Sequence, residues 1–430
     1  MSKPLKIAIA GLGTVGVGVI KILESHREMI AARAGRPVEI IAVSASNRSR
    51  ARGIDISAYD WVDNVLDFTT RDDVDIIVEL IGGSDGIAHA LARQALDRGK
   101  SFVTANKALI AHHGNELAEC AGKQQLALRF EAAVAGGIPI IKSLGEGLAA
   151  NRLNKVYGIL NGTTNYMLTQ MEATGRDYGE ILEETKLLGY LEADPSLDLD
   201  GIDAAHKLTI LSTVAFGVKA NFDDVYTEGI RRIKLVDIEY AKELGYRIKL
   251  LGIASLAKAG LEQRVHPCLV PNSAPIAHVD DGFNAIVVDG DFIDRTFYEG
   301  RGAGEGPTAS AVVADIIDIA RGHHGPAFFV PARAMQEVAL ISMSDRVGPY
   351  YIRLHVEEQP GVIADITAAL RDQDVSLHVM LQKGSEQDGS VYVVMVTHDT
   401  REQKLMNAMN QINALSSVID KALAIRIENL

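Results

Sequence analysis

The sequence has few cysteines, no long apolar run and no excess of basic residues, and each lack excludes a class of protein. Its two cysteines, Cys120 and Cys268, are too few for a disulfide framework or a CxxC metal site, and they suit a reducing compartment. No apolar run approaches the roughly 18 residues of a membrane span. The N-terminal segment lacks the apolar core and small-residue cleavage site of a secretory signal. We therefore expect a cytoplasmic protein.

Positive charge is also in short supply. The 430 residues include 43 Lys and Arg against 56 Asp and Glu, which gives a formal net charge of −13. Nucleic acids and anionic membranes attract a positively charged surface, so this balance argues against both as partners. The length is too great for one hydrophobic core and predicts two to three domains.

The first part of the chain alternates buried strands with helical segments. Residues 5–10 (LKIAIA), 38–44 (VEIIAVS) and 74–80 (VDIIVEL) are apolar runs typical of buried parallel strands. This rhythm predicts an α/β fold, a Rossmann-type doubly wound parallel sheet, over residues 1–135. A later apolar helix follows a glycine-rich stretch, and we expect residues 305–330 to pack back on this domain.

The rest of the chain has a different pattern. Strand-like residues 155–168 and helical stretches at 179–189 and 201–216 predict an α+β catalytic, substrate-binding and dimerisation domain over residues 136–304. Residues 349–430 show the order βαββαβ, which is enough chain for a small independent domain.

A glycine loop joins the first strand to the first helix. Gly11, Gly13 and Gly16 follow the pattern GxGxxG, in which glycines permit a tight turn, a close approach of the backbone to a pyrophosphate, and helix–strand packing. The helix that starts at Thr14 and Val15 would offer free N–H groups to phosphates. Glycines also serve strand-to-helix turns that bind nothing, but the context favours a dinucleotide.

The end of the second strand indicates which dinucleotide is bound. An NAD-preferring site places Asp or Glu there for the ribose hydroxyls. Here residues 44–48 are Ser-Ala-Ser-Asn-Arg, and two further arginines follow. Hydroxyl groups and the guanidinium of Arg48 suit a 2′-phosphate, so we expect NADP, with NAD left open. The alternative is that these arginines form a solvated loop.

A block of carboxylates and one lysine stands out in the second domain. Asp203 and Lys207 are four residues apart on a predicted helix and can pair on one face. A surface salt bridge would explain that spacing equally well. However, five acidic residues lie within 192–203, and the helix is apolar just downstream. A buried lysine near carboxylates can exchange a proton with a carbonyl or alcohol oxygen.

Four phrases occur in the same order as in a known family. They are TANKALIA (104–111), EAAVAGGIPII (131–141), GILNGTTNYML (158–168) and GYLEADPSLDLDGIDAAHKLTIL (189–211), and GRGAG at 300–304 adds to them. In these segments the chain resembles homoserine dehydrogenase over its first 330 residues. The resemblance implies reversible reduction of L-aspartate 4-semialdehyde to L-homoserine, in threonine, methionine and isoleucine biosynthesis.

The resemblance also implies roles for particular residues. Catalysis would involve Lys207, Lys107 and Asp203, and the substrate would be held by Glu192, Asp198 and Asp203. The cofactor would contact Gly11, Gly13, Thr14, Val15, Gly16, Arg48, Lys107, Gly189 and Gly302. A monovalent cation such as Na⁺ would be bound by the loop of Glu131, Val134, Gly136 and Ile138, mostly through backbone carbonyls.

The C-terminal segment resembles an ACT domain, a small ligand-sensing module, in its βαββαβ order and in Gly361 at its first strand–helix turn. This resemblance implies an amino-acid effector, threonine first, and a homo-oligomer, either a dimer or a tetramer. A plain ferredoxin-like domain that only assists assembly remains an alternative. For the whole chain, the alternatives are a non-catalytic amino-acid sensor and a dehydrogenase for another amino-acid semialdehyde.

Overall fold

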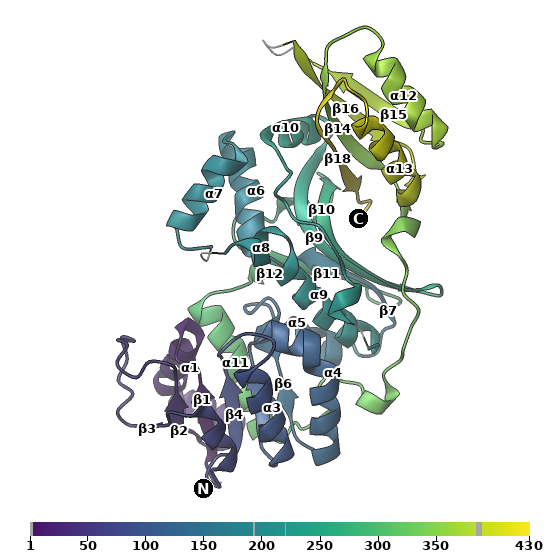
Figure 1. Cartoon of the computed structure of the whole chain (residues 1–430). Coiled ribbons are helices and arrows are strands. Elements are labelled where there is room, and N and C mark those ends of the chain that lie inside the picture. Colours follow the sequence, from purple (N-terminus) through teal and green to yellow (C-terminus); the bar gives the residue numbers. More distant parts are fainter. Residues whose placement is uncertain (1–2, 192–193, 220, 384–388) are drawn as a thin grey trace.

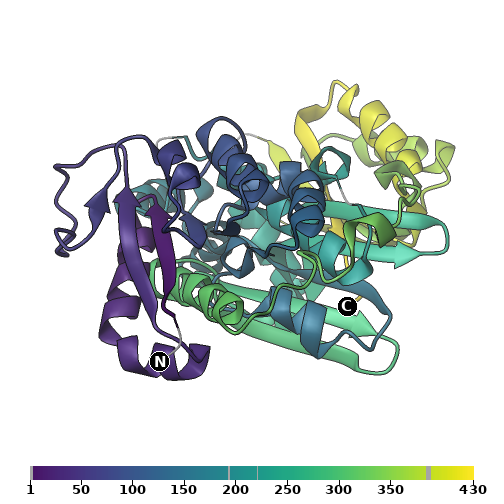
Figure 2. The same cartoon turned by 90° about the horizontal axis from the view of Figure 1, so that it is seen from below.

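The computed structural model describes residues 3–191, 194–219, 221–383 and 389–430. Two sheets organise the protein. A parallel sheet lies at one end of the molecule, and a larger mixed sheet extends from the middle to the other end (Figure 1). In the view from below, the C-terminal part stays on the side away from the N-terminal strands (Figure 2). Within these described ranges, no helix combines the length and apolarity needed to cross a membrane.

The first sheet has six parallel strands in the order β3-β2-β1-β4-β5-β6. This order reverses beside β1, as in a doubly wound dinucleotide-binding fold, and confirms the expected fold class. Ligands bind such sheets beyond the carboxyl ends of the strands at the reversal point. The elements are β1 (Leu5–Ala10), β2 (Val38–Ser44), β3 (Asp60–Trp61), β4 (Ile76–Glu79), β5 (Ser101–Thr104), β6 (Leu128–Arg129), α1 (Thr14–Ser25), α2 (Arg27–Ala34), α3 (Ile87–Asp97) and α4 (Lys107–Gln124).

A helix from much later in the chain, α11 (Glu305–Ala320), packs on α1. Gly18 permits this contact, because a Cβ there would lie only 2.9 Å from the Cβ of Ala309. Apolar side chains of α11 share one core with those of β1. These contacts support a first domain made of two segments, and its limits at 1–135 and 305–330 stay predictions.

The second sheet has the order β12-β11-β7-β9-β10-β18-β14-β16-β15, with the short strand β8 beside β10. Helix α9 lies against strands β7, β9 and β10 and is buried without a break from Asp203 to Val214, as expected of a helix between two layers. The elements of this half are α5 (Ile140–Lys142), β7 (Leu153–Ile159), α6 (Gly162–Thr174), α7 (Tyr178–Leu187), α8 (Ser196–Leu199), α9 (Ile202–Phe216), β8 (Tyr226–Thr227), α10 (Leu235–Glu243), β9 (Tyr246–Ala257), β10 (Gly260–Pro271), β11 (Phe283–Gly290) and β12 (Asp294–Arg301).

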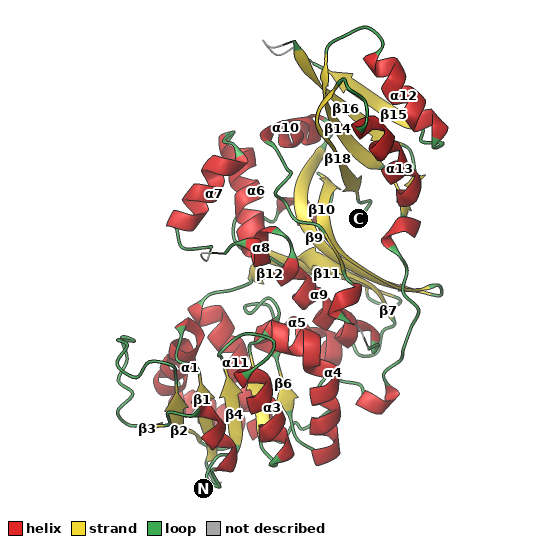
Figure 3. Ribbon diagram, viewed as in Figure 1, coloured by secondary structure: helices red, strands yellow, loops and turns green. Residues whose placement is uncertain are grey.

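The C-terminal part has the expected βαββαβ order, with α12 and α13 covering one face of its strands (Figure 3). Gly361 precedes α12 with φ +98°, a backbone conformation that favours glycine. The elements are β14 (Tyr350–Glu357), α12 (Val362–Asp372), β15 (Leu377–Gln382), β16 (Ser390–Thr397), α13 (Glu402–Asn413) and β18 (Val418–Ile427), with the short pair β13 (Val347–Gly348) and β17 (Thr400–Arg401) beside them.

The C-terminal part differs from the expectation of a small independent domain, because its last strand completes the central sheet. Strand β18 pairs in parallel with β10 at Cys268↔Arg426 and Leu269↔Ile427, and it pairs with β14 on its other side. Beside this seam, Glu428 is held by two buried arginines, Arg264 at 3.0 Å and Arg346 at 2.9 Å. Without β18 the backbone groups of β10 at Cys268 and Leu269 would lie at an uncovered sheet edge, since β8 covers only Arg264 and Val265.

Two asparagines cap the starts of helices, and at one of them, Asn161, the sequence predicts strand-like residues instead. The side chain of Asn161 accepts a hydrogen bond from the N–H of Thr164 (2.8 Å) and caps α6, so residues after β7 form a helix and not a strand-like turn. Asn106 caps α4 through the N–H of Leu109 (3.1 Å). Lys107 is therefore the first residue of an 18-residue helix. Asparagine is favoured both in turns and at helix N-caps, so its presence alone does not distinguish a turn from the start of a helix.

Candidate active site

The glycine loop has the geometry that a dinucleotide requires. At Gly11, with φ +107°, a Cβ would lie 2.5 Å from the carbonyl oxygen of Leu80, and at Gly16 it would lie 2.1 Å from that of Gly11. At Gly13 a Cβ would meet no atom within 4 Å, so this position faces open space. The first and third glycines thus serve tight packing, and the second leaves the backbone open to a ligand.

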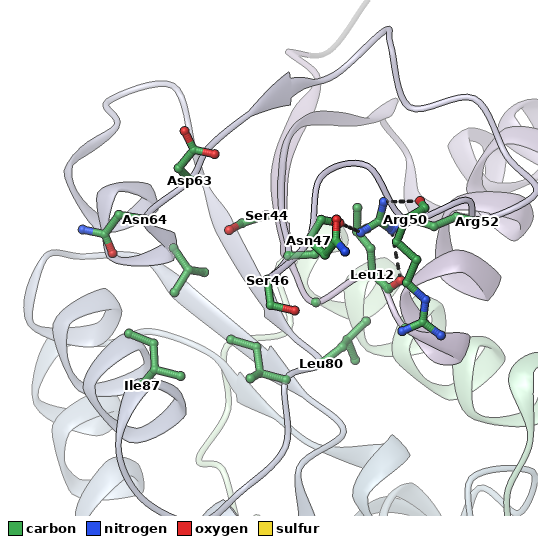
Figure 4. A pocket seen from close by; sticks show the side chains of 15 residues that line it. Leu12, Ser44, Ser46, Asn47, Arg50, Arg52, Asp63, Asn64, Leu80 and Ile87 are labelled. Carbon is green, nitrogen blue, oxygen red and sulfur yellow. Dashed lines mark hydrogen bonds between the residues drawn. The ribbon is translucent and has the colours of Figure 1, made fainter.

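The loop faces a cleft of about 540 Å³ at the point where the strand order reverses. Figure 4 shows Arg50 and Arg52 on one side of this cleft and Asp63 and Asn64 on the other. The first turn of α1, with Thr14 exposed and Val15 partly buried, lies next to it. N–H groups in the first turn of a helix have no partner within it and suit phosphate oxygens. The cleft therefore fits a dinucleotide.

Arg52 connects the two walls of the loop region. Its guanidinium donates hydrogen bonds to the backbone carbonyl oxygens of Leu12 (3.3 Å), Arg50 (2.7 Å) and Asn47 (Figure 4). Leu12 belongs to the glycine loop, and the other two follow β2. Because these donors are engaged, Arg52 fixes the shape of the loop that carries Arg50.

Arg48, the arginine expected at the cofactor, lies elsewhere. Its guanidinium sits 5.7 Å from the ring centre of Trp61, and it does not line the cleft. Arg50 does line the cleft. The arginine that faces the cleft is thus two residues along the same loop from the predicted cofactor ligand.

A second cleft, of about 1060 Å³, lies between the first sheet and the helices of the central sheet. It brings together residues far apart in the sequence, including the three predicted to act in catalysis. Asp203 lies between the two lysines. Lys207 Nζ donates to Asp203 Oδ2 (2.7 Å) and to the carbonyl oxygen of Leu160 (2.7 Å), and Lys107 Nζ lies 2.6 Å from Asp203 Oδ1.

Burial distinguishes the two lysines. The side chain of Lys207 is 10% exposed and that of Lys107 is 42% exposed. Burial lowers the pKa of Lys207, and Asp203 opposes this only in part. For Asp203, burial raises the pKa, but the two lysines outweigh it and bring the pKa below its ordinary value. The site therefore holds an ionised carboxylate beside a lysine that gives up its proton more readily than usual.

Asp198 is joined to this centre through Asn161. The side-chain amide of Asn161 donates to Asp198 Oδ1 (2.6 Å) and to Asp203 Oδ2 (2.8 Å). Burial, together with the charge of Asp203, raises the pKa of Asp198. Both carboxylates line the cleft. Glu192, the other residue predicted to hold the substrate, lies outside the described residues.

The two later glycines have different surroundings. Gly302 lines the cleft, and a Cβ there would lie 2.1 Å from Asn284 Nδ2. Asn284 in turn donates to the carbonyl of Leu160 (3.1 Å), which also accepts from Lys207, so Gly302 permits this packing. Gly189 follows α7 with φ +75° and does not line the cleft, whereas its neighbour Tyr190 does.

Three aromatic or imidazole side chains in the cleft were not anticipated as site residues. His206 stacks on Phe222 with ring centres 4.4 Å apart, and its Nε2 lies 3.3 Å from that of His112. Burial lowers the pKa of His206 to about 4. His206 lies on the same predicted helix as Asp203 and Lys207, three residues after Asp203, so the sequence could have indicated that it lies near the site. Phe222 and His112 come from other segments and carry no such signal.

The predicted cation loop adjoins the same cleft. The carboxylate of Glu131 accepts hydrogen bonds from the N–H groups of Ile141 (3.0 Å) and Lys142 (2.9 Å), so it is engaged within the protein. Val134 and Ile138 are buried, Ala135 has φ +48°, and the Gly136 N–H donates to the Gly302 carbonyl (3.0 Å). The carbonyl oxygens of this loop are hard ligands of the kind that an alkali ion prefers.

Comparisons with known proteins point to the same family for successive parts of the chain. Family models match at residues 11–131 (homoserine dehydrogenase, NAD binding domain), 139–317 (homoserine dehydrogenase) and 350–415 (ACT domain). A homoserine dehydrogenase of Pseudomonas aeruginosa is 44% identical over 435 residues, covering 100% of both chains.

Solved structures show the same likeness. The crystal structure of a homoserine dehydrogenase from Thiobacillus denitrificans superposes with a TM-score of 0.93 at 44% identity, covering 99% of this chain and 98% of that one. A hyperthermophilic archaeal homoserine dehydrogenase in complex with NADPH has a TM-score of 0.62 at 27% identity, covering 74% of this chain and 97% of that one.

Proposed function

Because the chain belongs to the homoserine dehydrogenase family of oxidoreductases, we propose that it reversibly reduces L-aspartate 4-semialdehyde to L-homoserine, in the biosynthesis of threonine, methionine and isoleucine. The observation that carries this proposal is the placement of Asp203 between Lys207 and Lys107 in a cleft beside the dinucleotide loop. Hydride transfer to an aldehyde builds negative charge on its oxygen, and the two ammonium groups would stabilise that charge.

Both lysines would act on the substrate oxygen. A bound nicotinamide dinucleotide supplies or accepts the hydride. Lys207, whose pKa is lowered by burial, would give a proton to the oxygen during reduction and take it back during oxidation. Asp203 would orient both ammonium groups through its two oxygens, and Lys107, which is more exposed, would contact the substrate oxygen from the cofactor side.

The substrate also carries an ammonium group, and this group needs a carboxylate. Asp198 faces the cleft and suits this group, with Glu192 expected to assist. Burial and the nearby charge of Asp203 raise the pKa of Asp198 above its ordinary value. A bound ammonium would offset both effects, which supports this assignment.

For the cofactor we favour NADP over NAD. Two features support this preference: Arg50 faces the cleft on a loop fixed by Arg52, and the similar archaeal enzyme was solved in complex with NADPH. Gly11, Gly13 and Gly16 would hold the pyrophosphate against α1. A monovalent cation such as Na⁺ would be held by backbone carbonyls of the loop from Glu131 to Ile138 and would support the adjoining cleft wall.

The C-terminal ACT domain is proposed to bind an amino-acid effector, threonine first, in a homo-oligomer. The larger sheet ends at strands β12 and β15, and end strands can pair with a second copy. Inhibition of the full chain by L-threonine, and sedimentation as a dimer or tetramer, test these two points. The free thiols of Cys120 and Cys268 suit the cytoplasm as the compartment.

One assay tests the main proposal. Purified protein is mixed with NADPH and L-aspartate 4-semialdehyde, and the absorbance of the reduced nicotinamide is followed, with L-homoserine and NADP⁺ for the reverse direction. Turnover in both directions is the expected result. A protein that binds amino acids without turnover would be a sensor, and preference for another semialdehyde would redirect the substrate assignment. Either result would overturn the proposal.

A further inference from the structure

The linking segment, residues 228–237, connects the substrate side of the central sheet to the C-terminal strands. It follows β8, passes the short helix α8 that carries Asp198, and enters α10. Residues 229–231 contact α8, and the residues on either side of them, Glu228 and 232–237, contact β18 and β14. The chemistry proposed above gives this segment no role.

The backbone of the linking segment lies directly against the end of α8. A Cβ at Gly229 would lie 1.9 Å from the carbonyl oxygen of Leu199, and the N–H of Ile230 donates to the same oxygen at 2.9 Å. This close approach is possible only because residue 229 is glycine. The segment and the end of α8 therefore cannot shift independently of each other.

The side chain of Arg231 spans the rest of α8. Its Nε lies 2.5 Å from Asp200 Oδ1 and its Nη2 lies 3.2 Å from Asp200 Oδ2, while Nη2 also donates to Ser196 Oγ at 3.3 Å. Ser196 begins α8 and Asp200 directly follows it. One guanidinium thus ties both ends of a four-residue helix, and Asp198 lies between the tied positions.

The residues of the segment on either side of 229–231 are fixed to the C-terminal strands, with Glu228 paired to Arg426 of β18. Arg232 Nη2 donates to the carbonyl oxygen of Ala422 in β18 at 2.6 Å. Lys234 Nζ lies 2.8 Å from Asp420 of the same strand. Asp237 is fully buried and pairs with Arg353 Nε of β14 at 2.8 Å. Neighbouring residues of one segment, Arg231 and Arg232, therefore contact the substrate-side helix and the C-terminal sheet respectively.

We propose that Arg231 is a positioning residue for the substrate site, and that the linking segment makes the position of Asp198 depend on the C-terminal sheet. The inference rests on the proposed pairing of Asp198 with the substrate ammonium. Arg231 does not line the cleft; it acts through Ser196 and Asp200 on the helix that presents the carboxylate. The expected effect is on the affinity for the amino-acid substrate and not on hydride transfer or dinucleotide binding.

The test uses full-chain variants assayed with L-homoserine and NADP⁺. We expect R231Q to raise the KM for L-homoserine about 10-fold and R232Q to raise it about 3-fold, with kcat and the KM for NADP⁺ changed by less than about 2-fold. R231K should restore part of the loss. R295Q is the matched control, because Arg295 forms a similar half-exposed pair with Asp289 at 2.8 Å in β12 and β11. D198N reports on the proposed substrate contact itself.

Each outcome has one meaning. An R231Q enzyme with an unchanged KM for L-homoserine overturns the positioning role, provided that D198N raises that KM. A normal KM in R232Q, with a raised KM in R231Q, overturns the dependence on the C-terminal sheet. If D198N itself leaves the KM unchanged, the assignment of Asp198 fails. Equal losses in R231Q and R295Q would show a general effect of removing surface arginines and would also overturn the proposal.

Discussion

Lys207 Nζ lies 2.7 Å from Asp203 Oδ2, one helical turn away on α9, and both side chains are nearly inaccessible to solvent. The second oxygen of the same carboxylate lies 2.6 Å from Lys107 Nζ. One buried carboxylate therefore faces two ammonium groups, and the site retains a net positive charge from these three groups. That charge suits an oxygen that becomes negative during hydride transfer.

Replacing Lys207 by Ala should lower kcat by about 1000-fold, because the substrate oxygen would lose its proton donor and acceptor. Asp203 would still pair with Lys107, so the fold should persist, as circular dichroism would show. Lys123→Ala is the control, since Lys123 forms an exposed pair with Glu119 on α4. Activity within a few fold of wild type in the Lys207 variant would refute the role.

The rate of L-homoserine oxidation should rise with pH, since Lys207 must be uncharged to accept the proton. Burial lowers its pKa, so the rise should end at a lower pH than the ordinary lysine value of 10.5 allows. Aldehyde reduction should show the opposite dependence, because it needs the charged lysine. Profiles of kcat/KM against pH in both directions check this, and profiles with the same slope would contradict it.

His206 should contribute to acid sensitivity of the fold. Its pKa is lowered by burial from 6.5 to about 4, so the unfolded chain binds a proton in this interval that the folded chain does not. The free energy of unfolding should therefore decrease as pH falls from 6.5 towards 4. In His206→Asn this part of the decrease should vanish, as measured by urea unfolding at several pH values. If the free energy of unfolding depends on pH in the same way in both proteins, His206 does not contribute to the acid sensitivity.

Arg50→Gln should raise the KM for NADPH about 10-fold and leave that for NADH almost unchanged, because only the former carries a 2′-phosphate. Steady-state kinetics with both cofactors measure the change. Arg98→Gln, an exposed arginine after α3, serves as the control. Equal changes in the KM values for NADPH and NADH would show that Arg50 does not distinguish the two cofactors.

Glu428→Gln should destabilise the protein by about 3–5 kcal/mol, because buried Arg346 would lose its charged partner and buried Arg264 would keep only Glu262. The side chains of Arg264 and Arg346 are 6% and 7% exposed, so water cannot replace the carboxylate. Asp374→Asn, which breaks an exposed pair with Lys404, should cost less than about 1 kcal/mol. Urea unfolding measures the loss of stability in each variant. Similar losses in the two variants would show that the burial of the Glu428 pairs does not matter.

Residue spacing predicts some parts of the site and not others. Asp203 and Lys207 are four apart on one helix, so their pairing follows from helical geometry. Lys107 reaches the same carboxylate from a different domain, and only the family resemblance indicated it. Asparagine is favoured in turns as well as at helix N-caps, so Asn161 did not reveal the start of α6 within residues that were predicted to be strand-like.

Contacts between segments far apart in the sequence are the other features that could not be predicted. The buried run around Cys268 is compatible with any neighbouring strand, so its pairing with β18 could not be foreseen. Arg48 and Arg50 are alike in sequence, and only the path of the loop decides which one faces the cleft. Local chemistry predicted most of the elements and the pairing of Asp203 with Lys207, and the long-range pairings needed the structure.

The pairing of β10 with β18 also has a consequence for synthesis of the protein. Strand β10 ends at Pro271, and the strand that covers its edge begins only at Val418. While the ribosome makes the intervening residues, the edge of β10 at Cys268 and Leu269, beyond the part that β8 covers, can pair with another nascent chain. The first domain similarly waits for α11 to cover α1. Completion of the second sheet and of the helical cover of the first is thus delayed until late in translation, and chaperone dependence should be greatest for chains that stop before β18.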